Sequence, residues 1–139
     1  MNILFMCVAN SARSQMAEGI AKKLLGAKSR IESAGSEPGE LNPFAVKASS
    51  EIGIDISANY SKSVDDLAAG FVATLDFVVT LCADEVCPVI ISNAKRLHWP
   101  IFDPAKAHGD DEAKIASFRV ARDLIYNKIS RFAEELSKG

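Results

Sequence analysis

Apolar positions along the chain predict four β-strands. Residues 2–6 and 75–81 are nearly continuous apolar runs, and the second is rich in β-branched residues, which is typical of strands buried on both faces of a sheet. Shorter runs at 30–34 and 96–99 predict a second and a fourth strand, each followed by turn-forming residues. We expect the strand at 75–81 to lie in the middle of a parallel sheet.

Apolar residues at helical spacing predict three main helices. The first spans residues 14–25 and stops at Gly26. The second runs from Pro43, in the first helical position, to about residue 52, with Asn42 as its N-cap. The third is a long C-terminal helix beginning after residues 109–110. Its apolar positions are Ile115, Phe118, Leu124, Ile125, Ile129, Phe132 and Leu136.

The order of these elements predicts the fold class. Strands alternate with helices, which indicates an α/β fold with a doubly wound parallel sheet. Ser63 is placed to cap a further short helix through residues 67–68. A chain of 139 residues without internal repeats or low-complexity segments is expected to form a single domain, residues 1–139.

Charge and hydropathy exclude several classes of function. Sixteen basic and eighteen acidic residues give a net charge of −2, so no basic face suited to nucleic acid is expected. No apolar run is long enough to span a membrane, and the N-terminus lacks the features of a signal peptide. We therefore expect a cytoplasmic monomer that binds neither nucleic acid nor membranes. In that reducing compartment, its three cysteines indicate catalytic chemistry rather than a disulfide framework.

Residues 7–14 form a small-residue loop between the first strand and the first helix. This order of strand, loop and helix directs backbone amides and a helix N-terminus at one point, which makes a cradle for an oxyanion. A thiol held there ionises readily, so Cys7 is a candidate nucleophile, and the Arg13 guanidinium is suited to bind two oxyanion oxygens. The alternative is that Cys7 is only a small buried apolar residue, the commoner role of a free cysteine. Its position at the carboxyl end of a strand favours the catalytic role.

Three further residues are predicted to lie at the same edge of the sheet: Cys82 after the central strand, Cys87 five positions later, and Asp103 after the fourth strand. With these in place, the chain resembles the arsenate reductases built on the low-molecular-weight tyrosine phosphatase fold. The resemblance covers nearly the whole length and is carried by the segments CVANSARSQMAEG, ESAG, LNPFAVKA, GIDIS, VVTLCADEVCP and HWPIFDPAKA. It implies a three-layer sandwich in which helices flank a four-stranded parallel sheet.

The resemblance also implies a role for each residue of the cradle. Cys7 would attack the arsenic of bound arsenate, and Ser14 would hydrogen-bond the Cys7 thiolate. The arsenate oxygens would be held by the Arg13 guanidinium and by the backbone amides of Val8, Ala9, Asn10, Ser11, Ala12 and Arg13. Asn10 would in addition fix the conformation of the loop. No cofactor and no metal ion is implied in this chemistry.

Asp103 is the candidate general acid, which would protonate the hydroxide that leaves arsenic. A carboxyl group acts as an acid at neutral pH when desolvation raises its pKa, and Trp99, Ile101 and Phe102 are apolar neighbours in sequence. The alternative is that Asp103 and Pro104 simply form a turn. The cradle favours the general acid.

Cys82 and Cys87 distinguish reduction from hydrolysis. In the family's scheme, Cys82 attacks the Cys7 sulfur and releases arsenite, and Cys87 then attacks Cys82, leaving a disulfide that thioredoxin reduces. A regular α-helix would separate the two Cα atoms by about 8.5 Å, beyond the roughly 7 Å limit for a disulfide. Residues 82–92 are therefore expected to be irregular, or to unwind on oxidation. The alternatives for Cys82 and Cys87 are buried structural thiols or a zinc site, for which only His98 and His108 are available as the two further ligands.

Three departures from the family bear on these expectations. Relatives often carry a cysteine at the position of Ala12, and the spacing between Cys82 and Cys87 is shorter than in well-known members. Some members bind potassium near the positions of Asn10, Glu18 and Ser33, but Lys62 stands where an acidic ligand would be expected. We expect the Lys62 ammonium to replace the ion.

Three other functions remain open from the residues. A protein tyrosine phosphatase would use the same cradle and Asp103, although such enzymes usually carry an aromatic residue where Ala105 stands. A reductase coupled to glutaredoxin would differ only in the final reductant. An oxyanion or redox sensor would use Cys7 without turnover, and would have no need of a general acid.

Overall fold

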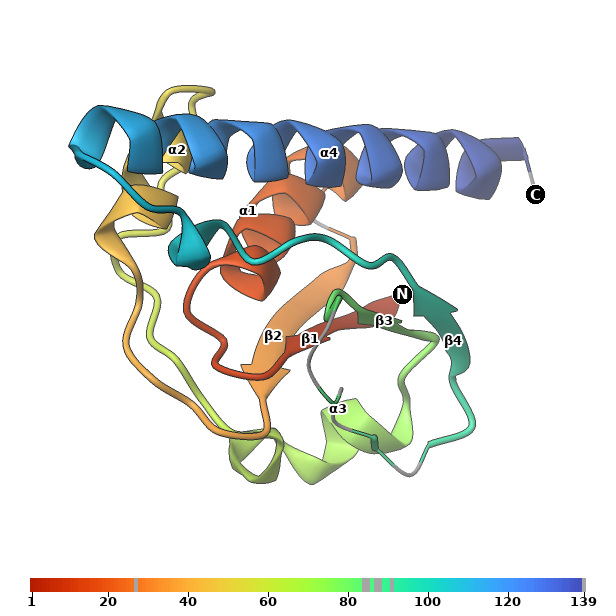
Figure 1. Cartoon of the computed structure of the whole chain (residues 1–139). Helices are drawn as coiled ribbons and strands as arrows, with labels where there is room; N and C mark the ends of the chain where they lie inside the picture. Colours follow the sequence, from red (N-terminus) through yellow and green to blue (C-terminus); the bar gives the residue numbers. More distant parts are fainter. Residues whose placement is uncertain (27, 84–85, 87–88, 91, 139) are drawn as a thin grey trace.

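The computed structural model describes residues 1–26, 28–83, 86, 89–90 and 92–138. Its centre is a four-stranded sheet in which every pair of neighbouring strands is parallel, in the order β2-β1-β3-β4. The strands are β1 (Asn2–Cys7), β2 (Arg30–Gly35), β3 (Phe77–Thr80) and β4 (Lys95–His98). Four of the predicted elements are thus confirmed as strands of one parallel sheet, with β1 and β3 in its interior (Figure 1).

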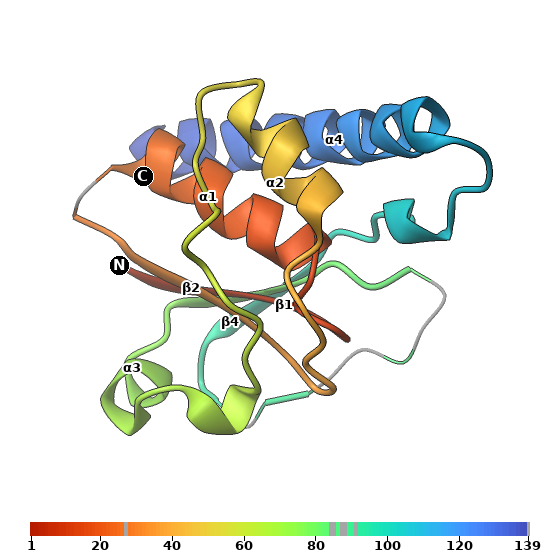
Figure 2. The same ribbon diagram turned by 90° about the vertical axis from the view of Figure 1, so that its left-hand side faces the viewer.

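Helices cover both faces of the sheet (Figure 2). One face carries α1 (Arg13–Leu25), α2 (Pro43–Ser50) and the long α4 (Asp111–Lys138), and the opposite face carries the short α3 (Ala69–Ala73). Two single turns of 3-10 helix, η1 (Val64–Asp66) and η2 (Pro104–Lys106), complete the order. This arrangement is the predicted three-layer sandwich. None of the helices among the described residues combines the length and apolar character needed to cross a bilayer.

The side chains of β1 explain why its sequence is a continuous apolar run. Successive residues of a strand point to opposite faces, so Ile3 and Phe5 join the core under α1 and α4, whereas Leu4 and Met6 join the core under α3. All four side chains are fully buried. A strand between two cores has no solvent-facing side, and therefore shows no alternation of polar residues.

The predicted caps are present. Asn42 Oδ1 accepts a hydrogen bond from the Phe44 amide at 2.9 Å, with Pro43 in the first turn of α2. Ser63 caps η1 in a reciprocal capping box with Asp66. Gly26 follows α1 with a φ of 78°, a conformation that glycine adopts without strain.

Two elements are shorter than the sequence predicts, and two further features of the structure differ from the prediction. The helix α2 ends at Ser50, two residues early, and β3 covers only residues 77–80 of the predicted 75–81. The helix α3 was not predicted, because its five residues include a glycine and no side chain caps its N-terminus. Its Phe71 side chain is fully buried in the core on that face of the sheet. Leu124 lies on the outer face of α4, with 44% of its surface exposed, and does not join the core as its neighbours do.

Candidate active site

The candidate site begins where β1 ends. Cys7 is the last residue of β1, residues 8–12 form a loop, and α1 starts at Arg13. Cys7 is a free thiol and is buried. The loop curves around a pocket of about 190 Å³ at the carboxyl edge of the sheet. The pocket is lined by Cys7, Val8, Ala9, Ser11, Ala12, Arg13, Asp103 and Ala105.

Backbone hydrogen bonds fix the orientation of this loop. The carbonyl oxygens of Val8, Ala9 and Ser11 each accept a bond from the segment that follows β2. The donors are the amides of residues 37, 39 and 42, at 2.9, 3.0 and 2.9 Å respectively. These three carbonyl oxygens point away from the pocket, toward their donors, and so do not face a bound anion. The backbone N–H groups of the loop are then the polar groups that can face the pocket. The helix α1 has no side-chain cap at Ala12, which leaves its first amides without a capping side chain.

Close contact between β2 and the loop requires a glycine at position 35. A Cβ atom added to Gly35 would lie 2.3 Å from the Val8 carbonyl oxygen and 3.0 Å from the Asn10 nitrogen. No side chain fits there. Gly35 therefore allows the carboxyl end of β2 to lie directly against the loop, which supports the loop from behind.

A chain of hydrogen bonds leads to the Cys7 sulfur, and its direction follows from the donors. The Lys62 backbone N–H can only donate, so Asn10 Oδ1 is its acceptor at 3.0 Å. The amide nitrogen of Asn10 then faces Ser14 and donates to its Oγ at 2.8 Å. Ser14 Oγ lies 2.9 Å from Cys7 Sγ. Because Ser14 accepts from Asn10, its own proton is available to the sulfur, which in the thiolate form can only accept.

Asn10 lies behind the pocket rather than among the residues that line it. Its φ is 50°, the left-handed region that asparagine tolerates better than most residues, and it is fully buried. Its carbonyl oxygen accepts from Ser61 Oγ at 2.7 Å, in addition to the side-chain bonds described above. The structure thus places Asn10 as a support of the loop.

Arg13 reaches from α1 to the segment after β4. Its guanidinium is almost fully buried, lines the pocket, and donates from Nη1 to the Ile101 carbonyl oxygen at 3.0 Å. The planar fork of a guanidinium matches two oxygens of a tetrahedral anion. Arg13 is therefore held at the pocket wall in a position suited to bind such an anion.

Asp103 lines the same pocket and also forms a turn. Its Oδ1 accepts a hydrogen bond from the Ala105 amide at 3.0 Å, and this bond caps η2. The turn predicted for Asp103 and Pro104 is therefore present. Asp103 also lines the pocket, where a general acid would have to lie. Ile101 is buried nearby in sequence, but Phe102 is exposed. Of these two sequence neighbours of Asp103, only Ile101 is buried, so the apolar surroundings predicted for Asp103 are present only in part.

Cys82 is buried next to the end of β3, two residues beyond Thr80, which pairs with Met6 in β1. The Leu81 amide continues this pairing with a bond to the Met6 carbonyl at 2.9 Å. Cys7 and Cys82 therefore follow neighbouring strands at the same edge of the sheet. Cys87 lies outside the described residues, as does part of the segment 82–92; the described part of that segment contains no helix or strand.

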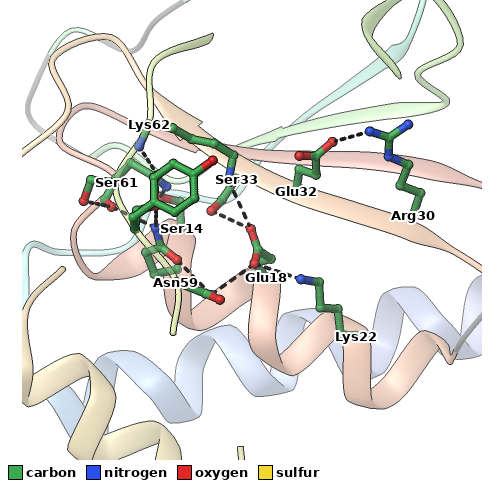
Figure 3. Close-up of polar contacts among 12 residues, drawn as sticks. Ser14, Glu18, Lys22, Arg30, Glu32, Ser33, Asn59, Ser61 and Lys62 are labelled. Atoms are coloured by element: carbon green, nitrogen blue, oxygen red, sulfur yellow. Dashed lines mark hydrogen bonds and ion pairs between the residues drawn. The ribbon is translucent and has the colours of Figure 1, made fainter. Parts of the chain in front are cut away.

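A charged cluster lies behind the loop and is centred on the buried carboxylate of Glu18 (Figure 3). Glu18 Oε1 accepts from Ser33 Oγ at 2.9 Å and lies 3.8 Å from Lys62 Nζ. Glu18 Oε2 accepts from Lys22 Nζ at 3.0 Å and from Asn59 Nδ2 at 3.1 Å. Two ammonium groups thus neighbour this carboxylate. Within the described ranges, no group of three His, Cys, Asp or Glu residues is arranged to hold a metal ion.

The sequence analysis missed the residues that support the cradle from a distance. Gly35 lies against the loop, and Gln15 and Ser61 bond Asn10 directly, yet only Gly35, within a turn-rich segment, gave a signal in the sequence. The two histidines of the sequence lie outside the pocket: His98, at the end of β4, is exposed and its Nδ1 bonds Thr80 Oγ1 at 2.7 Å, and His108 is exposed in a loop.

Comparison with known proteins agrees with this geometry. Residues 2–139 match the family model described as low molecular weight phosphotyrosine protein phosphatase. An arsenate reductase of Halalkalibacterium halodurans is 52% identical over 134 residues, which cover 95% of this chain and 94% of that protein. An arsenate reductase of Bacillus subtilis is 48% identical over the same length, with the same coverage.

Two solved structures have the same fold. The structure of an arsenate reductase in the phosphate binding state superposes with a TM-score of 0.77 at 30% identity, covering 97% of this chain and 98% of that chain. A thioredoxin-dependent arsenate reductase of Corynebacterium glutamicum has a TM-score of 0.61 at 26% identity, covering 91% of this chain and 60% of that chain.

Proposed function

Because the chain belongs to the low molecular weight phosphotyrosine protein phosphatase family, we propose that it reduces arsenate to arsenite through a relay of three cysteines. The chain is an enzyme of the arsenate reductase type, supported by relatives that are about half identical to it over nearly their whole length. The observation that carries the mechanism is the convergence of Cys7, Arg13 and Asp103 on one pocket of about 190 Å³.

The first step is nucleophilic attack on bound arsenate. Arg13 and the loop amides hold the arsenate oxygens, while the Cys7 thiolate, which accepts a hydrogen bond from Ser14, forms a bond to arsenic. Asp103 donates its proton to the departing hydroxide, which leaves as water. The product is arsenic(V) bound to the Cys7 sulfur. Val8 to Arg13 supply the backbone amides of this step, and Asn10 contributes mainly by fixing the loop.

The second step transfers two electrons. The Cys82 thiolate attacks the Cys7 sulfur, the electron pair of the sulfur–arsenic bond leaves with arsenic as arsenite, and a Cys7–Cys82 disulfide forms. Cys87 then attacks Cys82 and releases the Cys7 thiolate. The remaining disulfide returns to dithiol by accepting two electrons from thioredoxin, the reductant indicated by a relative that is described as thioredoxin-dependent. The reducing cytoplasm supplies that reductant, and the role is arsenic detoxification.

Phosphatase activity is the second candidate, because the same cradle is able to bind phosphate. A phosphocysteine at Cys7 would form and hydrolyse with Asp103 as acid and then as base. Ala105, however, lines the pocket where an aromatic side chain would flank a phenyl ring. We therefore expect at most a residual activity on aryl phosphates.

The test measures arsenate-dependent oxidation of NADPH with thioredoxin and thioredoxin reductase. Turnover by the wild type that is lost in both Cys82→Ser and Cys87→Ser supports the relay. A matched assay measures hydrolysis of an aryl phosphate, which requires Cys7 but neither Cys82 nor Cys87. If arsenate turnover is absent and phosphate hydrolysis survives both substitutions, the protein is a phosphatase and the relay is wrong. Replacing thioredoxin by glutaredoxin and glutathione in the same assay identifies the reductant.

A further inference from the structure

Gln15 is a fully buried polar side chain near the start of α1. Buried amides are stable only when their donors and acceptors are satisfied, so the partners of this side chain show what it holds in place. Gln15 does not line the pocket, and neither the sequence analysis nor the proposed mechanism uses it. Its partners lie in the loop and in the segment before η1.

The contacts of Gln15 define which way its amide points. Its Nε2 lies 3.2 Å from the Asn10 carbonyl oxygen and 3.0 Å from the Tyr60 carbonyl oxygen. Backbone carbonyls can only accept, so the amide nitrogen must face them. The same nitrogen lies 3.0 Å from Asn10 Oδ1, and Gln15 Oε1 accepts from Asn59 Nδ2 at 3.1 Å. Both ends of the side-chain amide are therefore engaged.

These contacts act on the residue whose backbone is strained. Asn10 has a φ of 50°, which is disfavoured for a residue other than glycine unless its surroundings hold it there. Gln15 contacts both the backbone oxygen and the side-chain oxygen of Asn10, and so restrains the peptide and the rotamer together. That rotamer directs the Asn10 nitrogen to Ser14, which in turn contacts the Cys7 sulfur.

We propose that Gln15 is a positioning residue for the Cys7 nucleophile. Its amide locks Asn10, Asn10 orients the Ser14 hydroxyl, and Ser14 stabilises the thiolate. Anchoring by Asn59 and Tyr60 fixes Gln15 itself to the segment 59–62, so the reactivity of Cys7 depends on a part of the chain that does not touch the substrate. The proposal rests on the proposed function only in that Cys7 is the nucleophile.

The test follows the reactivity of the Cys7 thiol directly. In a Cys82→Ser, Cys87→Ser background, Cys7 is the only cysteine, and its alkylation by iodoacetamide is measured as a function of pH. Gln15→Met removes both hydrogen-bonding ends at similar volume. We expect the pH of half-maximal alkylation to rise by about one unit, and the rate at pH 6 to fall about tenfold. Gln15→Glu, whose carboxylate cannot donate to the carbonyls, should change the profile in the same direction.

Controls separate positioning from packing. Met16→Leu alters the next residue along α1, which is equally buried but whose thioether side chain has no amide to donate to the oxygens of Asn10, and should leave the pH profile unchanged. Protection of Cys7 by inorganic phosphate should keep the same half-saturating concentration in Gln15→Met, because the amides and Arg13 remain. In the thioredoxin assay, where Gln15→Met is made with Cys82 and Cys87 in place, the turnover number should fall while the KM for arsenate is retained.

The outcome that overturns the proposal is a lower melting temperature with an unchanged alkylation profile, which would make Gln15 a packing residue. If Gln15→Met does not fold, Gln15→Glu, which keeps the shape of the side chain, provides the same comparison, and an unchanged profile there has the same meaning. Because alkylation needs no arsenate, it tests Gln15 even if the wild type fails to reduce arsenate. Failure of the proposed function and failure of this inference are thus distinguishable.

Discussion

At the scale of single residues, the site depends on small distances behind the cradle as much as on the groups inside it. The left-handed Asn10, the Ser14 hydroxyl and the Cys7 sulfur are linked by bonds of 2.8 and 2.9 Å, and the loop rests directly on Gly35. The reaction rate is sensitive to small shifts of these groups, because it falls steeply when a nucleophile is displaced from its attacking position.

Gly35→Ala should impair the enzyme without touching the substrate. The added Cβ would lie 2.3 Å from the Val8 carbonyl oxygen, which forces the loop outward. A displacement near 1 Å costs about a hundredfold in turnover. Steady-state arsenate reduction measures this effect. Gly70→Ala is the matched control, since a Cβ at that position in α3 meets no atom within 4 Å and favours the helix. Equal turnover of the Gly35→Ala protein and the wild type would contradict the role of this contact.

At the scale of elements, α2 and α4 are joined by an exposed cluster of charges. Arg119 donates to the Glu51 carboxylate from Nη2 at 2.6 Å, and from Nε to both carboxylate oxygens at 2.9 and 3.2 Å. Arg122 Nη1 donates to the same carboxylate at 2.9 Å. The hydrogen bonds from Arg119 are the main cause that lowers the pKa of Glu51 from 4.5 to about 2. Arg122 also donates to the Ala48 carbonyl, so the end of α2 is attached to α4 at two points.

The lowered pKa of Glu51 predicts a pH dependence of stability. A carboxyl group whose folded pKa is depressed stabilises the fold fully above its unfolded value near 4.5 and loses that contribution as the pH falls toward 2. Glu51→Gln should therefore unfold at lower urea concentration than the wild type at pH 7, with the difference disappearing between pH 4.5 and pH 2. Glu134→Gln, exposed on α4, is the control and should show no such dependence. A constant difference at every pH would rule out the charge as the cause.

The elements that could be predicted from sequence are those specified locally. The apolar run of β1, the Asn42 cap and Gly26 depend on neighbours within a few positions, and all three appear in the structure. The cradle itself was also predictable, because a strand, a small-residue loop and a helix follow each other directly. The links from Gln15 to Asn59 and Tyr60 were not, since their partners are brought together only by packing of distant segments.

At the scale of the whole molecule, the charged cluster around Glu18 joins α1, β2 and the segment before η1. Lys62 Nζ and Lys22 Nζ neighbour the carboxylate where the resemblance to the family suggested an ion. We expect arsenate turnover to be the same in potassium chloride and in sodium chloride at equal ionic strength. A severalfold stimulation by potassium would refute the replacement of the ion by Lys62.

The relay requires that the region after β3 change when its cysteines are oxidised. We expect hydrogen exchange in residues 82–92 to be faster in the oxidised protein than in the reduced one, because in the proposed relay the Cys82–Cys87 disulfide has to become accessible to its reducing partner. Exchange in β1 serves as the internal reference and should not change. Equally slow exchange of residues 82–92 in both forms would contradict this opening.

The pairing of β1 with β3 has a consequence for how the enzyme is made. Met6 and Thr80 are partners in the sheet, but they are separated by more than half of the chain. Contacts between such distant positions form slowly, because closing so long a loop costs conformational entropy before the contact repays it. A nascent polypeptide that has emerged only as far as α3 carries Cys7 without β3, and thus without the neighbouring thiol. In the proposed relay, the sulfurs of Cys7 and Cys82 can therefore approach each other only after more than half of the 139 residues have been made.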